Sequence, residues 1–382
     1  MIVPKLYEYQ EVMKSAIITH KGWALFVEMG LGKTVVMLEL FKMAKKGTVI
    51  IVVCPKSVIH SWVTDIKKFT DLNYRLIIGT KKKRVKELVL LFGEGGIGII
   101  NYEGLASLDT QIALFKRAGC IVLDESSKIK NHKAIRTRLI TKVSEKVSHK
   151  YILSGTPIAN NYTDLYTQLK FISPNIWGGK NFYAYRNRYC KMGGFKNKQI
   201  VGYKNTDELK KIVASISTQY KKEDCIDLPP KVYSTRVMDM SPEMEKQYKQ
   251  MAKEMVLELE GGTIEAGQAV VQMGRLKQIL AGEYLEPSKN DKLKELMELV
   301  DIAMERERQV VIWTQFRFSH RVIREILTSR GIPFSNIYGD TTTDDRIKMI
   351  DDFQSGKTKV FVASITACDM GVTLTASDIA IY

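Results

Sequence analysis

The sequence is poor in the residues that build covalent cross-links and metal centres. Its 382 residues include five cysteines and five histidines, all scattered, and no two cysteines form a C-x-x-C pair. This argues against a disulfide framework and a zinc site, and favours a reducing compartment. No apolar run approaches the ~18–20 residues of a membrane-spanning helix, and residues 1–9 show no signal-peptide pattern. We therefore expect no membrane association.

Acidic residues are also scarce relative to basic ones. The chain has 42 Asp and Glu against 58 Lys and Arg, which gives a net charge of +16. Such a surplus favours a polyanionic partner, and nucleic acid fits better than an anionic membrane because no basic amphipathic helix stands out. The alternative is a basic protein that is merely soluble. A hydrophobic content of 45% supplies cores for about two or three domains.

The most informative segment that is present is a glycine-containing run that separates an apolar stretch (23–27) from a helical pattern (35–46). Glycines let backbone N–H groups surround phosphates, and the following helix adds positive potential at its N-terminus. Lys33 would reach the β- and γ-phosphates, and the Thr34 hydroxyl would bind Mg²⁺. The strict pattern has glycine where this chain has Val27, so a glycine turn before an ordinary helix is the alternative. The residues of the predicted ATP-binding loop are Glu28, Met29, Gly30, Leu31, Gly32, Lys33 and Thr34.

Strand-like and helix-like segments alternate in both halves of the chain. Apolar, β-branched runs predict strands, which in the first half cover 48–53, 76–78, 97–100, 120–124 and 151–154 and in the second 309–314, 334–338, 359–363 and 379–382. Helical spacing predicts helices at 58–69, 83–92, 243–260, 292–305, 319–330 and 344–353. The fold class is therefore α/β, with parallel sheets covered on both faces and ligands at the carboxyl ends of the strands.

The segment 173–231 differs from both halves. It holds twelve Lys and Arg against five Asp and Glu, together with eight aromatic residues, and Leu228-Pro-Pro230 breaks the chain near its end. We interpret it as a mainly helical basic insertion with a linker. Its cations would neutralise phosphates and its aromatic rings would stack on bases, although the rings would equally serve as a small core. The predicted domains are 1–172, 173–231 and 232–382, the last with a helical segment at 243–286.

Two further motifs follow strands of the first half. The acidic pair Asp124-Glu125 would use Asp124 to hold Mg²⁺ and Glu125 to orient and deprotonate the water that attacks the γ-phosphate. The alternative is an acidic surface turn. Ser154, Gly155 and Thr156, before a proline, predict a loop that senses the γ-phosphate and relays its loss, with a plain tight turn as the alternative.

In order and spacing these motifs resemble the Swi/Snf branch of the superfamily 2 helicases, which are double-stranded-DNA translocases. EMGLGKT is that branch's form of the phosphate loop, which accounts for Val27. The segments that carry the resemblance are 6–10, 28–34, 53–57 with Trp62, 101–103, 124–131, 153–157, 228–231, 312–316, 338–340 with Arg346 and Phe353, and 364–382.

The resemblance implies two RecA-like lobes with Mg²⁺-ATP between them and DNA across both. Gln10 would read adenine; Lys33, Asp124 and Glu125 would be catalytic. The loop at 154–156 would couple hydrolysis to movement. Contacts with the DNA backbone imply no sequence preference, and the residues expected to make them are Lys56, Asn101, Lys128, Lys130, Thr314, Gln315 and Ser364.

The chain departs from the family pattern in two places. Asp369-Met370 stands where motif V usually has a glycine pair, and motif VI, the source of the arginine fingers, does not occur before Tyr382. An arginine finger contributes ~10³–10⁵ in rate. We therefore expect this chain to bind ATP and DNA but to hydrolyse ATP weakly, and we expect residues beyond the strand at 379–382.

No bromodomain-like, chromodomain-like or nuclease segment is visible, and the insertion is short. This favours a compact DNA-dependent ATPase that remodels forks, Holliday junctions or R-loops. The alternatives are a translocase that displaces proteins, such as a transcription-complex or chromatin-type remodeller or a restriction-system motor, and a non-catalytic ATP-gated DNA clamp. We expect a monomer in the cytoplasm of a bacterium or phage-infected host, or in the nucleus if the organism is a eukaryote.

Overall fold

The computed structural model describes residues 5–194, 199–227, 229–260, 266–368 and 374–382, without side chains at 254–260, 266–269 and 343. The chain divides into two compact units, Met1–Pro230 (unit 1) and Lys231–Tyr382 (unit 2). Several residues singled out in the sequence lie outside the described ones, namely Phe195, Leu228, Gly261, Gly262, Asp369, Met370, Gly371 and Thr373.

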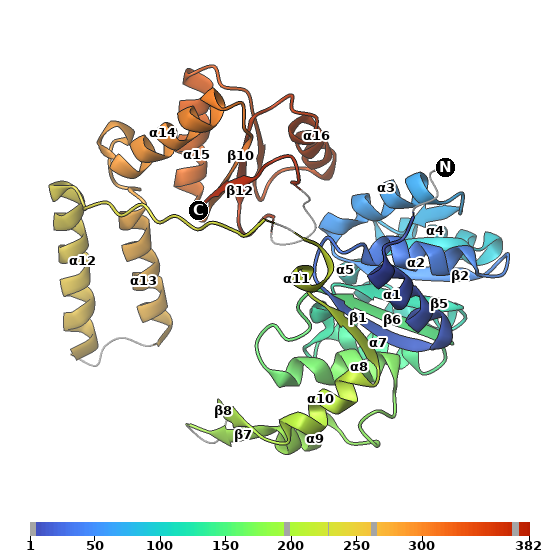
Figure 1. Cartoon of the computed structure of the whole chain (residues 1–382). Helices are drawn as coiled ribbons and strands as arrows, with labels where there is room; N and C mark the ends of the chain where they lie inside the picture. The colour runs from blue at the N-terminus through green and yellow to red at the C-terminus, as the bar shows by residue number, and fades with distance from the viewer. Residues whose placement is uncertain (1–4, 195–198, 228, 261–265, 369–373) are drawn as a thin grey trace. The chain divides into compact units, whose positions relative to one another are not determined.

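Unit 1 is built on a seven-stranded parallel sheet with the order β3-β4-β2-β5-β6-β1-β9 (Figure 1). Its strands are β1 (Gly22–Val27), β2 (Val49–Cys54), β3 (Tyr74–Leu76), β4 (Gly96–Asn101), β5 (Cys120–Asp124), β6 (His149–Ser154) and β9 (Ser217–Tyr220). Its helices are α1 (Glu8–Thr19), α2 (Lys33–Lys42), α3 (Ile59–Phe69), α4 (Lys81–Glu94), α5 (Tyr102–Ala106), α6 (Ile112–Phe115), α7 (Ile135–Ser144), α8 (Leu165–Ile172), α9 (Phe182–Tyr189), α10 (Thr206–Ala214) and α11 (Lys222–Cys225).

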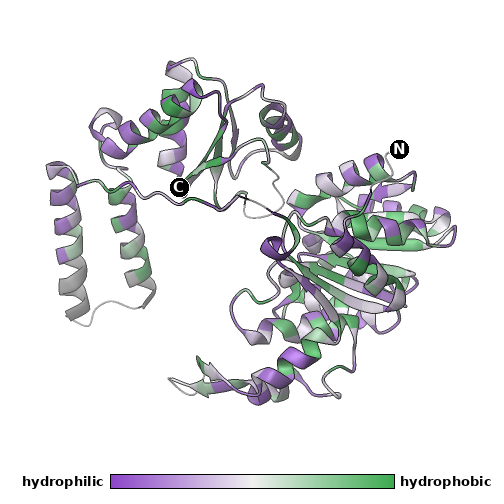
Figure 2. Ribbon diagram, viewed as in Figure 1, coloured by the Kyte–Doolittle hydropathy of each residue, from purple (hydrophilic) through white to green (hydrophobic). Residues whose placement is uncertain are grey.

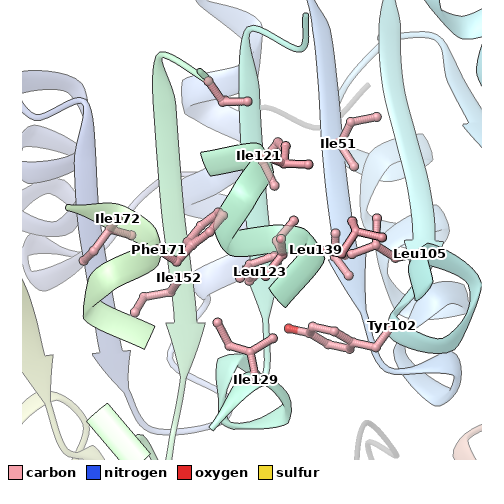
Figure 3. Packing of buried hydrophobic residues seen from close by; sticks show 14 of the residues in the cluster. Ile51, Tyr102, Leu105, Ile121, Leu123, Ile129, Leu139, Ile152, Phe171 and Ile172 are labelled. Carbon is pink, nitrogen blue, oxygen red and sulfur yellow. The ribbon is translucent and has the colours of Figure 1, made fainter. Parts of the chain in front are cut away.

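Helices cover both faces of this sheet because successive strand residues point to opposite sides. In β2, Ile51 and Val53 join the core beneath α4, α5, α7 and α8, whereas Ile50 and Val52 join the core beneath α1, α2 and α3. Figure 3 shows the first core, where β-strand isoleucines and leucines meet side chains of α7 and α8. The central strands of this sheet are accordingly coloured as hydrophobic in Figure 2.

The segment 173–231 requires one correction to the sequence interpretation. It is helical in part, but it also contains an antiparallel hairpin, β7 (Cys190–Gly193) with β8 (Gln199–Tyr203), and strand β9. β9 pairs with β1 in parallel and extends the sheet of unit 1, so that unit runs to Pro230 and not to residue 172. Four of its eight aromatic residues, among them Trp177 and Tyr185, belong to the core beneath α4, α5, α7 and α8 or pack against it.

Unit 2 contains a second parallel sheet with the order β11-β12-β10-β13. Its strands are β10 (Val310–Thr314), β11 (Phe334–Ile337), β12 (Val360–Ser364) and β13 (Ile379–Ile381). Helices α14 (Asp291–Glu305) and α15 (Arg317–Ser329) pack on one face, and α16 (Thr343–Gln354) packs on the other. Two further helices, α12 (Pro242–Glu260) and α13 (Ala266–Leu280), lie against each other (Figure 1). In the described part of the chain, every helix is too short or too polar to cross a membrane.

Candidate functional site

The glycine run forms the loop between β1 and α2. Gly30 and Gly32 have φ values of +85° and +78°, which side chains disfavour, and α2 begins at Lys33. Lys33 Nζ donates to the carbonyl oxygens of Val27 (2.6 Å) and Glu28 (3.1 Å). The lysine ammonium therefore lies within the loop itself.

Gln10 packs directly on this loop. Its Oε1 accepts from the backbone N–H of Tyr7 (3.0 Å), and its Nε2 donates to the Leu31 carbonyl (3.2 Å). A Cβ atom at residue 32 would displace the Gln10 amide, and the φ of +78° would strain any residue with a side chain there. Gln10, predicted to read adenine, thus also holds the phosphate loop in place.

The acidic pair lies at the carboxyl end of β5 and is buried. The Asp124 carboxylate accepts from Trp62 Nε1 (2.8 Å) and from the backbone N–H of Glu125 (3.0 Å), and the Asp124 carbonyl accepts from Tyr102 Oη (2.8 Å). Glu125 has φ = +50°, a conformation uncommon for a residue with a side chain. Such strained backbone is typical of functional sites.

The electrostatics of the site link the acidic pair to the loop lysine. Burial raises the pKa of the Asp124 carboxyl, while the Trp62 hydrogen bond and the charge on Lys33 oppose the rise. Burial and then the charge of Asp124 raise the pKa of Glu125. Burial lowers the pKa of Lys33, and both carboxylates oppose that change. The Lys33 ammonium and the two carboxylates thus attract one another, which offsets part of the effect of burial on each pKa.

The residues present suit Mg²⁺. A buried carboxylate at Asp124 and a partly exposed hydroxyl at Thr34 are the hard oxygen ligands this ion prefers, with water and phosphate oxygens completing its shell. In the described residues there is no cluster of three or more acidic, histidine or cysteine side chains that would form an all-protein cage. A metal that arrives with a nucleotide fits this donor set.

The third predicted loop meets the first. Ser154 ends β6 and is fully buried, and its Oγ accepts from the backbone N–H of Thr156 (3.1 Å). A Cβ atom at Gly155 would lie 3.5 Å from the backbone nitrogen of Met29. Strands β1 and β6 are neighbours, so their carboxyl ends bring the phosphate loop and the 154–156 loop into contact.

The sequence analysis missed a buried side chain on α8 that joins two of these loops. The Gln168 Oε1 accepts from Ser126 Oγ (2.7 Å), directly after the acidic pair, and its Nε2 donates to the carbonyls of Pro157 (2.7 Å) and Asp164 (2.7 Å). Thr167 Oγ1 donates to the Ile129 carbonyl (2.6 Å). The only signal in the sequence was a polar residue on an otherwise apolar helical face.

The predicted DNA contacts of unit 1 differ in accessibility. Lys56 is exposed just beyond β2, and Lys128 and Lys130 are partly exposed after the acidic pair. Asn101 is buried at the end of β4, and its Nδ2 donates to Glu103 Oε2 (2.9 Å).

The predicted contacts of unit 2 lie at the ends of two paired strands. Thr314 and Ser364 are register partners in β10 and β12, and both are buried. The Thr314 hydroxyl donates to the Ala363 carbonyl (3.2 Å), and Ser364 Oγ bonds to Thr366 Oγ1 (3.0 Å). Gln315, the next residue after Thr314, is exposed.

Comparisons with known proteins agree with this geometry. The SNF2-related domain matches residues 10–285, and the helicase conserved C-terminal domain matches residues 288–382. The SWI/SNF-related matrix-associated actin-dependent regulator of chromatin subfamily A-like protein 1 homolog of Caenorhabditis elegans is 26% identical over 100% of this chain. The putative ATP-dependent helicase/translocase YwqA of Bacillus subtilis is 25% identical over 94% of it. The chain spans 54% and 40% of the lengths of these two relatives.

A solved structure shows the same fold. The Sulfolobus solfataricus SWI2/SNF2 ATPase core in complex with dsDNA aligns over 95% of this chain and 78% of that chain, with a TM-score of 0.51 and 24% identity. The two parallel sheets described above correspond to the tandem RecA-like lobes of that core. The SNF2-related domain covers well over half of the residues of the present chain, and the chain therefore belongs to the SNF2-related helicase family.

Proposed function

We propose that the protein is an ATP-dependent DNA translocase. The observation that carries this proposal is the meeting of three loops at one edge of the unit 1 sheet. Lys33, the Asp124-Glu125 pair and Gly155 follow three separate strands. The acidic pair interacts electrostatically with Lys33, and Gly155 approaches the Met29 backbone. Family membership supports the same activity.

Each side chain has a distinct role in this proposal. Backbone N–H groups of the loop and Lys33 bind the phosphates, and Thr34 with Asp124 holds the Mg²⁺ that arrives with ATP. Magnesium supplies charge neutralisation at the phosphates when it is bound. Glu125 holds the attacking water and accepts its proton, for which its burial and raised pKa suit it. Ser154, Gly155 and Thr156 respond to the phosphate through Met29, and the close approach of Gly155 to the Met29 backbone supports this role.

DNA is the proposed polyanionic partner. The chain carries a net charge of +16, and one structural relative is an ATPase core in complex with dsDNA. Among the predicted contacts, Lys56, Lys128, Lys130 and Gln315 are exposed or partly exposed and would bind the backbone directly. Asn101, Thr314 and Ser364 are already hydrogen-bonded within their units, so we assign them to shaping the strand ends.

A finer proposal concerns the DNA structure. We propose that the substrate is branched DNA, because little sequence intervenes between the family motifs. Displacement of proteins from DNA is the second candidate. It is favoured by a 25% identity over 93% of this chain to the ISWI chromatin-remodeling complex ATPase CHR17 of Arabidopsis thaliana.

The test compares ATP hydrolysis with single-stranded, duplex, forked and four-way DNA. We expect DNA to stimulate the weak hydrolysis expected of this chain, and we expect Lys33→Ala and Glu125→Gln to abolish that stimulation. The matched controls Lys46→Ala and Glu145→Gln remove the same charges from exposed sites and should behave as wild type. Nucleotide-gated DNA binding with no turnover would support the clamp instead. Equal stimulation by all duplex forms, without strand displacement on forks or junctions, would contradict the branched-DNA proposal.

A further inference from the structure

A second lysine reaches the phosphate loop from a distant part of the chain. Lys222 is the first residue of α11 and follows Glu28 by 194 residues in the sequence. It belongs to none of the motifs described above. Its position is set by β9, the edge strand that the sequence analysis did not predict.

The backbone of this segment is attached to the loop by three features. β9 pairs with β1 up to the register Val27 with Tyr220. The Glu28 N–H donates to the Tyr220 carbonyl (3.1 Å), and the Lys222 N–H donates to Glu28 Oε2 (2.9 Å). The Cα of Lys222 is therefore fixed with respect to the first residue of the phosphate loop.

The side chain of Lys222 lies over Gly30. A Cβ atom at Gly30 would lie 3.4 Å from Lys222 Cε and 3.6 Å from its Nζ. Lys222 is partly buried, and among the described residues its ammonium has no hydrogen-bond or ion-pair partner. Its neighbour Lys221 is exposed and pairs with Glu223 at 2.9 Å.

The arrangement places two cations at one loop. Burial lowers the pKa of Lys33, and the charge of Lys222 adds to this, because two ammonium groups at one loop repel each other. Such repulsion is relieved when an anion with several negative oxygens binds beside both. A half-buried lysine without a partner next to a glycine with φ = +85° is suited to a phosphate group.

We propose that Lys222 is a second phosphate-binding lysine of the nucleotide site. This inference rests on the proposed function, because it needs the loop to bind a nucleotide. Lys222 would then contact the phosphates of the nucleotide. It lies in the last segment of unit 1, which ends at Pro230.

The experiment measures nucleotide affinity by displacement of a fluorescent ATP derivative from the full chain. A charge-assisted contact to phosphate predicts about tenfold weaker ATP binding for Lys222→Ala. Lys222→Arg keeps the charge and should restore most of the affinity. Lys221→Ala is the matched control, since it removes an adjacent lysine that faces solvent and Glu223, and it should bind ATP as wild type does.

Competition with ATP, ADP and AMP distinguishes a phosphate contact from a structural effect. The Lys222→Ala loss should be largest for ATP and smallest for AMP, with an unchanged far-UV spectrum and melting temperature. An equal loss for all three nucleotides, or wild-type affinity for ATP, would overturn the proposal for Lys222. If the wild-type chain binds no nucleotide while it remains folded, the proposed function itself fails.

Discussion

Replacing Gln168 with methionine would test how firmly α8 holds the two loops beside the phosphate site. Methionine is unbranched and about as long as glutamine. Its thioether has no hydrogen to donate and accepts hydrogen bonds only weakly. In Gln168→Met, the Ser126 hydroxyl and the Pro157 carbonyl lose their present partner, whereas the Asp164 carbonyl, which precedes α8, keeps the backbone N–H of residue 168. Gln168 and Ser126 have no exposed surface, so water does not replace the lost amide without a rearrangement.

The magnitude follows from the number of groups left without a partner. A buried polar group without a hydrogen bond costs about 1–3 kcal/mol, so two such groups at the lower limit give a loss of about 2 kcal/mol in the free energy of unfolding of unit 1. Ser126→Ala alone leaves only the Gln168 Oε1 without its donor, and we expect a loss of about 1–2 kcal/mol. The double variant should lose less than the two single losses added together, because both single variants break the same bond.

The assay is urea unfolding followed by tryptophan fluorescence in a Trp313→Phe background. Trp313 lies in unit 2, and the other three tryptophans, Trp23, Trp62 and Trp177, lie in unit 1, so the signal then reports unit 1 alone. A Gln168→Met loss below about 0.5 kcal/mol, or strictly additive losses, would refute the reasoning that this amide connects the loops.

Three further predictions concern other sites. Burial raises the pKa of Asp65 to about 6, so the free energy of unfolding falls as pH rises from about 4 to about 6. Asp65→Asn should therefore stabilise the protein by up to about 3 kcal/mol at pH 8 and leave its stability unchanged near pH 3.5, measured by urea unfolding. Trp62→Phe removes the hydrogen bond to Asp124. It should raise about tenfold the Mg²⁺ concentration needed for half-maximal nucleotide binding, measured by Mg²⁺ titration. Gly22→Ala should lower the melting temperature, because its Cβ would overlap a main-chain oxygen at the end of α8, whereas Gly93→Ala, in a helix facing open space, should raise it slightly.

The sequence predicts the parts of the site that are local. β5 was predicted with its observed bounds because its apolar run, ending in Asp124, is buried on both faces. Lys33 and Thr34 were placed at a helix start by the two glycines before them, and α2 does begin at Lys33. Local periodicity and turn chemistry are sufficient in these cases.

Contacts between distant segments were not predictable in the same way. β9 is short and mostly polar, and it is a strand because it pairs with β1, almost two hundred residues earlier. Lys222 and Gln168 acquire their positions only through that pairing and through α8. Nothing in the local sequence pattern indicates that the Thr314 hydroxyl bonds inside its own unit.

The placement of β1 also has a consequence for biosynthesis. Its two partners in the described sheet, β6 and β9, are made more than 120 residues later, although β1 carries the apolar run that leads into the glycine loop. At ~5–20 residues per second, that strand waits roughly 6 to 25 seconds for its first neighbour. During this interval the nascent chain exposes an unpaired hydrophobic strand, which makes it a substrate for ribosome-associated chaperones. Nascent fragments that end before β6 should therefore aggregate instead of folding.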